Sequence, residues 1–568
     1  MPPPRAKALM KPTKSKKATK EPKLDDADDY LALASEHEDA MGKHRAGDAS
    51  KSLRFARRAL DVYSQGLAKF PRNFDLAYNK ARLELEVATH PNLSDALDVP
   101  TVDLLRQTLS SHQYAIDLES ENADTLFNMA QVLTALAETI MQDHPVNSNE
   151  KEALDFLEKA LDYQGRCFAI QQKAFIQSQL EFEQAMSEDV TLNNDASIHD
   201  TPTGLETSSA PKTQDEEEEQ WVSVVEPVTA DTLLDTIIAQ VNTLTTLCSS
   251  VNYSLPMLSD QEATASLGWI ESFSTKLLTG TLPDLTNKHR DALSKERLSE
   301  AALAKAVFTG EFLEVSFRAH ALLDPQRYKR ELDAAFSQAE LDRNSDEFLL
   351  ACARALISFN SVLAESSYYY AHHHGVVPGD DGGSDPSSSP VSSLRWSVLI
   401  EAQSHLTAAS KLPAAAEDSR LLATTHLLRG DISLLLHALA YARPAAHPQA
   451  RSTRAQLARN AEVYYRNAGK LFGTLGEEED GGEEKAVAEL KGGVVKILRQ
   501  LHDVEGGGGA SSDEGSSGPA PAPALRASPQ QLQEALGGLA RAKGERWVKD
   551  KLDECVEEGL VMEGFLPY

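Results

Sequence analysis

The chain has 568 residues, of which 41% are hydrophobic and only 6% aromatic, and its formal net charge is −30. This length and apolar content suffice for more than one packed core, whereas the acidity opposes binding to nucleic acid or anionic lipid and favours basic protein partners. The sequence contains no uninterrupted run of about 18 apolar residues, so it predicts no membrane-spanning helix. The four cysteines lie far apart without a CxxC spacing, which predicts reduced, buried thiols in a cytoplasmic or nuclear protein.

The chain begins with a basic arm, residues 1–25. Residues 1–24 hold seven Lys, one Arg and one Glu, so the remaining chain carries about −37. The arm has no apolar run, so we expect it to be neither a signal peptide nor a membrane anchor, and we expect it to be disordered. Its Lys-rich stretch, residues 11–17, is either a nuclear import signal or a plain tail.

Helical and polar segments alternate along the rest of the chain. The predicted helical blocks are 26–180, 229–366, 393–475 and 528–568. The predicted disordered segments are an acidic insertion at 181–228, a loop at 367–392, and a mostly flexible acidic and Gly-rich segment with one short helix at 476–527. Such polar compositions lack the apolar area that offsets chain entropy.

Local signals mark where several of these segments begin. Thr229 or Asp231 can cap the helix in which apolar residues recur every three or four positions up to Cys248. Ser528 and Pro529 form an N-cap and first-turn pair for the last block. The segment "WVSVV", residues 221–225, is expected to be extended and to dock Trp221 onto the helices.

A pattern of small and large residues recurs in four predicted helices. Ala59, Tyr63 and Gly66 fall on one helix face, and Pro71 then ends the helix pair. The small residues admit a neighbouring helix, and the large residue fills the groove between them. The same spacing recurs at Ala153, Leu157 and Ala160, at Ala402, Leu406 and Ala409, and at Ala461, Tyr465 and Ala468. Between the last two sets, Gly430 and Asp431 are predicted to form a turn.

A second pattern, apolar–aromatic–Asn–x–Ala, occurs at 77–81 and 126–130, 49 residues apart. Together the two patterns resemble the tetratricopeptide repeat (TPR), a helix–turn–helix of about 34 residues. The resemblance covers about half of the chain, and the 49-residue offset departs from a regular repeat. It implies an all-α fold: a TPR-like α-solenoid of stacked helical hairpins with long disordered insertions. The alternative is an irregular helical bundle with Ala-rich packing.

The resemblance also implies a peptide-binding groove lined by Asn79 and Asn128, with Tyr78, Lys80 and Phe127 beside them. An Asn amide offers a donor and an acceptor that match the backbone of an extended peptide. The alternative for either Asn is a hydrogen bond to a neighbouring helix or to water.

No catalytic signature is present. The motifs GxxxxGK[ST], HExxH and GxSxG are absent, as is a GxGxxG after a strand. His372–His374 lie in a Gly/Pro/Ser-rich segment, and consecutive residues alone do not build a tetrahedral metal site. We therefore expect a non-enzymatic protein with no cofactor and no metal, although a site assembled from distant residues stays open.

Charge and resemblance together lead to a functional hypothesis. The acidic runs 215–220 and 476–484 either solvate the chain or screen a basic client. The first hypothesis is a protein-interaction scaffold, a chaperone or assembly factor for a basic client such as a ribosomal protein or a histone. The alternative is a TPR co-chaperone adaptor that captures acidic tails of heat-shock chaperones, which the acidic helix before Asn79 would repel. We expect no direct nucleic-acid or membrane partner, and the client and oligomeric state stay open.

Overall fold

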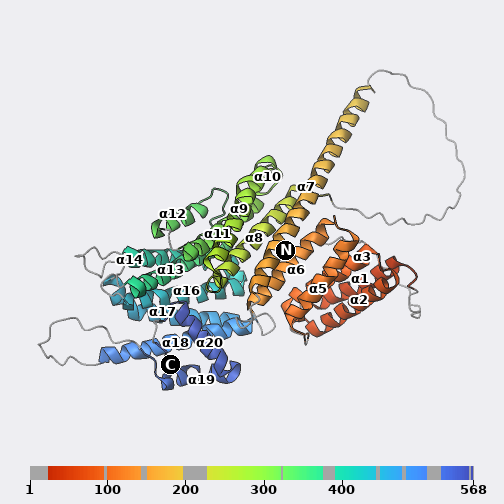
Figure 1. The fold of residues 1–568 in the computed structure, drawn as a ribbon. Helices are drawn as coiled ribbons and strands as arrows, with labels where there is room; N and C mark the ends of the chain where they lie inside the picture. The colour runs from red at the N-terminus through yellow and green to blue at the C-terminus, as the bar shows by residue number, and fades with distance from the viewer. Residues whose placement is uncertain are drawn as a thin grey trace, which may run out of the picture. The chain divides into compact units, whose positions relative to one another are not determined.

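The computed structural model describes residues 24–45, 47–94, 97, 99–142, 150–195, 227–320, 324–374, 390–442, 448–475, 481–507, 526–561 and 565–566. Every regular element within these ranges is a helix, and they contain no strand (Figure 1). The fold is therefore all-α, as predicted. The chain divides into two compact units, Met1–Ser120 and Glu121–Tyr568. The division falls inside the block predicted at 26–180.

The first unit is built from consecutive helices that pack on one another. They are α1 (Ala27–His44), α2 (Ala49–Lys69), α3 (Phe74–Thr89), α4 (Pro91–Ser94) and α5 (Thr101–Leu118). Helix α2 packs against α1 and α3, and α3 packs against α5. Asp48 caps α2, and Asn73 caps α3 by accepting from the Leu76 backbone N at 2.8 Å.

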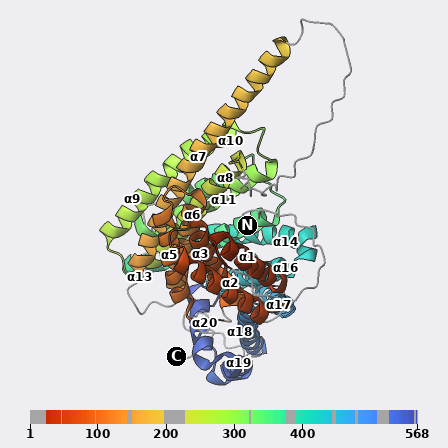
Figure 2. The same cartoon turned by 90° about the vertical axis from the view of Figure 1, so that its right-hand side faces the viewer.

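The second unit continues the same plan over a longer array. Its helices are α6 (Ala123–Gln142), α7 (Glu150–Asp195), α8 (Ala230–Ser254), α9 (Asp260–Lys276), a π-turn η1 (Leu277–Thr281), α10 (Leu282–Lys288), α11 (Lys295–His320), α12 (Pro325–Ala335), α13 (Asp346–His374), α14 (Pro390–Ala409), α15 (Pro413–Glu417), α16 (Ser419–Ala442), α17 (Pro448–Phe472), α18 (Gly481–Gly507), α19 (Pro529–Lys543) and α20 (Glu545–Glu557). Each long helix packs on the next, and Figure 2 shows α16, α17 and α18 side by side. This array of stacked helices is solenoid-like.

Helices extend into all three of the internal segments for which the sequence predicted disorder. Helix α7 continues to Asp195, and α13 continues to His374. Helix α18 replaces the short helix expected in 476–527, because its apolar residues Val494 and Leu498 recur one turn apart and are buried. The Gly and Glu residues around Val494 and Leu498 interrupt the apolar pattern, so the helical spacing was not recognised from the sequence. The predicted caps Thr229 and Ser528 are confirmed.

The small–large–small sets are buried in α2, α7, α14 and α17. Gly66 shows why a small residue is needed: a Cβ there would lie 3.0 Å from Leu76 and 3.1 Å from Tyr30. Helices α1 and α3 therefore approach α2 closely at this point. Pro71 is exposed in the turn that joins α2 to α3. The 49-residue offset arises because residues 90–100, which include α4, lengthen the connection from α3 to α5.

The predicted turn at Gly430 and Asp431 is wrong, because both residues lie inside α16. A Cβ at Gly430 would lie only 2.5 Å from Cε1 of Tyr465, which is fully buried on α17. Glycine is therefore required for the close approach of the Tyr465 ring and not for a change of chain direction.

We expect Gly430→Ala to lower the free energy of unfolding by roughly 1–3 kcal/mol, because the buried ring must shift. This loss would exceed the gain of about 1 kcal/mol in helix propensity. The matched control is Gly268→Ala in α9, where an added Cβ meets nothing within 4 Å and should stabilise the helix. Urea unfolding compares the two variants, and equal midpoints would contradict this explanation.

One described segment, Asp346–Ser366 of α13, is long and apolar enough to cross a membrane by composition, with a mean hydropathy of 1.4. Half of its apolar window is buried inside the protein. Phe359 and Leu363 are fully buried in the main hydrophobic cluster. The apolarity of this segment is thus used in packing, as in the core helix of a water-soluble domain.

An ion cluster around the buried Lys491 joins α16, α18 and the end of α20. Lys491 Nζ lies 3.0 Å from Asp431 Oδ1 and 3.2 Å from Glu558 Oε2. The Tyr465 hydroxyl also donates to Asp431, at 2.8 Å. The C-terminal helices are therefore fixed to the array by charge as well as by apolar contacts.

Candidate functional site

An acidic row crosses neighbouring helices of the second unit. We define it by Glu138 on α6, Glu311 and Glu314 on α11, and Glu365 on α13. Helix α8 lies between α6 and α11 and packs against both. The four carboxyl groups come from positions far apart in the sequence, so that helix packing alone brings them into one row.

Polar side chains of α8 and one Arg connect the acidic row. Three α8 residues recur at a spacing of three and each donates to one carboxylate: Thr246 to Glu138 at 3.4 Å, Ser249 to Glu311 at 2.8 Å, and Asn252 to Glu314 at 3.1 Å. Arg318 lies 3.0 Å from carboxylate oxygens of both Glu314 and Glu365. Neither Glu138 nor Glu311 forms an ion pair with a Lys or Arg of the described part of the chain. The row thus retains uncompensated negative charge.

The surroundings of Glu138, Glu311 and Glu365 disfavour ionisation of these three carboxyl groups. Burial raises the pKa of Glu311, and the adjacent Glu314 raises it further. Partial burial also raises the pKa of Glu138 and of Glu365, although Arg318 opposes the effect at Glu365. An additional cation placed against the row would stabilise the ionised forms and lower these pKa values. The row is therefore suited to receive Lys or Arg side chains.

We expect Glu311→Gln to raise the free energy of unfolding at pH 7 by about 0.5 kcal/mol, because it removes like-charge repulsion one turn from Glu314. The folded-state pKa of Glu311 is raised, so ionisation opposes folding as pH rises from the ordinary value of about 4.3 through the folded-state value. The gain should accordingly be absent at low pH and grow across that window. Urea unfolding at several pH values measures it, with the exposed Glu271→Gln as control. A gain that does not depend on pH would contradict this origin.

The predicted groove residues of the first unit point in different directions. Asn79 Nδ2 donates to the Asp75 backbone O at 2.8 Å, and Tyr78 stacks on Phe74 with ring centroids 5.7 Å apart. Successive helical residues are rotated by about 100°, so Tyr78, Asn79 and Lys80 face three different surroundings. Of these three residues, only Lys80 lines the hollow between α2 and α5.

The second asparagine occupies a different environment. Asn128 lies on α6 in the second unit and is 8% exposed, whereas Phe127 beside it is half-buried. Asn79 is half-buried on α3 of the first unit. The same sequence pattern thus gives two asparagines with unequal access to water.

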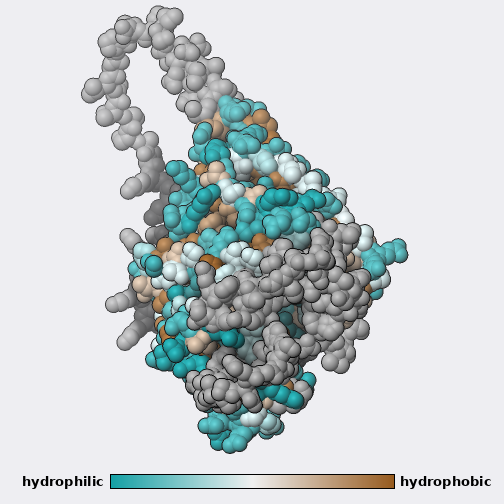
Figure 3. All heavy atoms as spheres, turned by 90° about the vertical axis from the view of Figure 1, so that its left-hand side faces the viewer, coloured by the Kyte–Doolittle hydropathy of each residue, from teal (hydrophilic) through white to brown (hydrophobic). Residues whose placement is uncertain are grey.

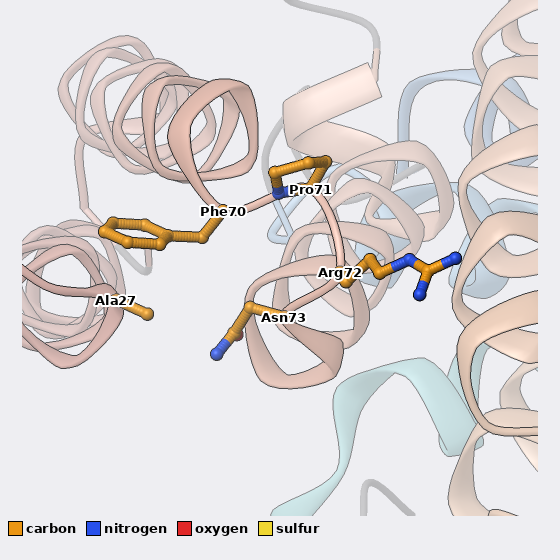
Figure 4. A pocket seen from close by; sticks show the side chains of 5 residues that line it. All are labelled: Ala27, Phe70, Pro71, Arg72 and Asn73. Carbon is orange, nitrogen blue, oxygen red and sulfur yellow. The ribbon is translucent and has the colours of Figure 1, made fainter.

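Two shallow hollows lie in the first unit. One, of about 450 Å³, lies between α2 and α5 over α3, and its lining includes Leu67, Lys80 and Tyr114. The other, of about 460 Å³, lies at the α2–α3 turn and is lined by Ala27, Phe70, Pro71, Arg72 and Asn73. Figure 4 shows the Phe70 ring directed towards Ala27 and the Arg72 guanidinium directed away from it. Among the described residues, no Asp or Glu lines either hollow, so neither lining matches a basic ligand.

The other candidate features give no site among the described residues. No group of three or more His, Cys, Asp or Glu in these ranges is placed to hold a metal ion. His372–His374 form the last turn of α13, and the runs 11–17, 215–220 and 221–225 lie outside the described residues. The four cysteines are free and buried, as predicted, and burial raises the pKa of Cys167 to about 12. On the face in Figure 3, hydrophilic side chains predominate, with apolar ones scattered among them.

The fold and the site together define an all-α protein of stacked helices with an acidic row. No family model matches this chain. It is 31% identical over 161 residues to UPF0656 protein C926.02 of Schizosaccharomyces pombe, a match covering 28% of this chain and 35% of that protein. The chain thus spans about a third of that relative's length. A solved circular tandem repeat protein aligns over 94% of this chain and 98% of its own with 12% identity, but its TM-score of 0.26 does not establish a shared fold.

Proposed function

We propose that this protein is a non-enzymatic scaffold that holds a basic protein client and acts as a chaperone or assembly factor. The observation that carries the proposal is the acidic row. Its central member, Glu311, is half-buried and forms no ion pair with a Lys or Arg of the described residues, although the charge of Arg318 on the same helix partly stabilises its ionised form. A partly buried charge is stabilised by an opposite charge, which a Lys- or Arg-rich segment of a client supplies.

The net charge of −30 supports the same class of client. A large negative field accelerates encounter with a basic protein and repels acidic partners and nucleic acid. Ribosomal proteins and histones are the client classes that we propose, in the cytoplasm or the nucleus. An adaptor for acidic chaperone tails would have to overcome repulsion from the same field.

We further propose that the hairpins are irregular tetratricopeptide repeats. The buried small–large–small sets and the close approach at Gly66 support this assignment. The long α3–α5 connection accounts for the unequal spacing of the two Asn patterns. The repeat architecture by itself does not define the function, since many functions share it.

Affinity purification of the full chain, followed by mass spectrometry, tests the proposed client class. We expect basic ribosomal or histone proteins to be enriched and to dissociate as salt is raised. Enrichment of heat-shock chaperones without basic proteins would instead support the adaptor. Recovery of neither class would overturn the proposal.

A further inference from the structure

Helices α7 and α8 run antiparallel in a register that two hydrogen bonds define. Gln164 Nε2 donates to Thr243 Oγ1 at 3.0 Å, and Thr236 Oγ1 donates to Gln171 Oε1 at 2.7 Å. Seven residues separate the two contacts on each helix, so the register is constant between them. When this register is continued, Ala230 at the start of α8 is level with Gln177 of α7. Helix α7 extends beyond that level (Figures 1 and 2).

Phe182 is the large apolar residue that continues the α8-facing side of α7 past the start of α8. It follows Gln171 by 11 residues, about three helical turns, and therefore lies on nearly the same face. Gln171 is 6% exposed where α8 covers it, whereas Phe182 is 67% exposed about 7.5 Å beyond the start of α8. Leu180, by contrast, points to the opposite side, because nine residues correspond to two and a half turns.

The chain that leads into α8 must pass this position. Thr229, the N-cap of α8, is level with residue 178 in the same register. The apolar segment Trp221–Val225 ends only four residues before Thr229, and eight extended residues reach about 26 Å. Every residue of this segment can therefore reach Phe182. A Trp and three Val side chains can pack against an exposed Phe ring, and this packing would remove apolar surface from water.

We propose that Trp221–Val225 packs against Phe182 and extends the α7–α8 interface past the start of α8. Glu181 and Glu183 flank Phe182 and repel the acidic run 215–219 that precedes Trp221. The docking rests on the α7–α8 geometry and does not require the proposed function to be correct.

The test uses the full chain labelled with 5-fluorotryptophan, whose four Trp residues give four ¹⁹F resonances. Trp221→Phe assigns the resonance of Trp221. We expect this resonance to lie away from its position in the urea-unfolded chain, and Phe182→Ala to move it to that position while the other three stay in place. The matched control is Leu180→Ala, which removes a side chain that is 49% exposed on the other side of α7 and should leave Trp221 unchanged.

Three results would overturn the proposal. The first is a Trp221 resonance at the unfolded position in the wild-type chain. The second is an equal shift in the two Ala variants, which would show that docking is not specific to Phe182. The third is a Trp221 shift that disappears on dilution together with a change in sedimentation, which would show that a second copy covers Phe182. Client capture is measured separately, so its loss or retention does not affect this outcome.

Discussion

Lys491→Met is expected to lower the free energy of unfolding by about 3–5 kcal/mol, because it leaves Asp431 as a buried charge without its cation. Lys491 is 8% exposed, and its ammonium group contacts Asp431 and Glu558. Burial alone would lower the pKa of Lys491, but these two carboxylates outweigh burial and raise it. After the substitution Asp431 would retain the Tyr465 hydroxyl as its hydrogen-bond donor in this cluster.

The pH dependence of this loss follows from the direction of the pKa shift. A raised lysine pKa stabilises the folded state fully below the unfolded value of about 10.4, and this stability is lost as pH rises through the folded-state value. The difference between variant and wild type should therefore be constant from neutral pH up to about pH 10.

Lys496→Met provides the matched control, because Lys496 lies on the same helix α18 but is exposed. Its effect should stay within about 0.5 kcal/mol. The double variant Asp431→Asn/Lys491→Met should recover part of the loss, since no unpaired charge remains at residue 431. Urea unfolding of all three variants measures these differences. Equal losses for the two Lys→Met variants would show that the ion cluster does not stabilise the C-terminal helices.

The second large effect concerns binding. The double reversal Glu138→Lys/Glu311→Lys is expected to weaken capture of a basic client by about 100-fold, because close charge pairs at interfaces contribute several kcal/mol. Neither carboxylate has a Lys or Arg partner in the described ranges, so the reversal breaks no ion pair there. Isothermal titration with the purified client measures the dissociation constant.

A control variant with the same change in net charge distinguishes the effect of the acidic row from the effect of the total charge of the protein. Glu271→Lys/Glu347→Lys changes the net charge by the same amount at two exposed positions outside the row. This control should weaken capture much less and chiefly slow association. If both double variants lose affinity equally, total charge and not the row explains client binding.

Helix caps and the small–large–small faces could be predicted because their signals are local. Thr229 and Ser528 begin α8 and α19 as predicted, since a cap depends only on the following three residues. Gly430 was misassigned because a glycine that admits a ring from another helix looks the same in sequence as one that turns the chain. The difference lies in the position of Tyr465, which no local window contains.

The acidic row could not be predicted from the sequence. Its carboxylates lie on α6, α11 and α13, and a chain with 86 Asp and Glu residues gives no reason to select these four. The available signal was the regular spacing of Thr246, Ser249 and Asn252 on a helix that mixes apolar residues with many other Thr, Ser, Asn and Asp residues. Polar residues at helical spacing inside such a helix indicate a polar neighbour, but only packing shows which one.

The most direct test of the central claim is zero-length carbodiimide cross-linking of the full chain to its captured client, with mass spectrometry of the linked peptides. This chemistry joins a carboxylate to an amine only when the two are in contact. We expect bonds from client lysines to Glu138, Glu311 or Glu365. Bonds confined to carboxylates outside the acidic row would contradict it.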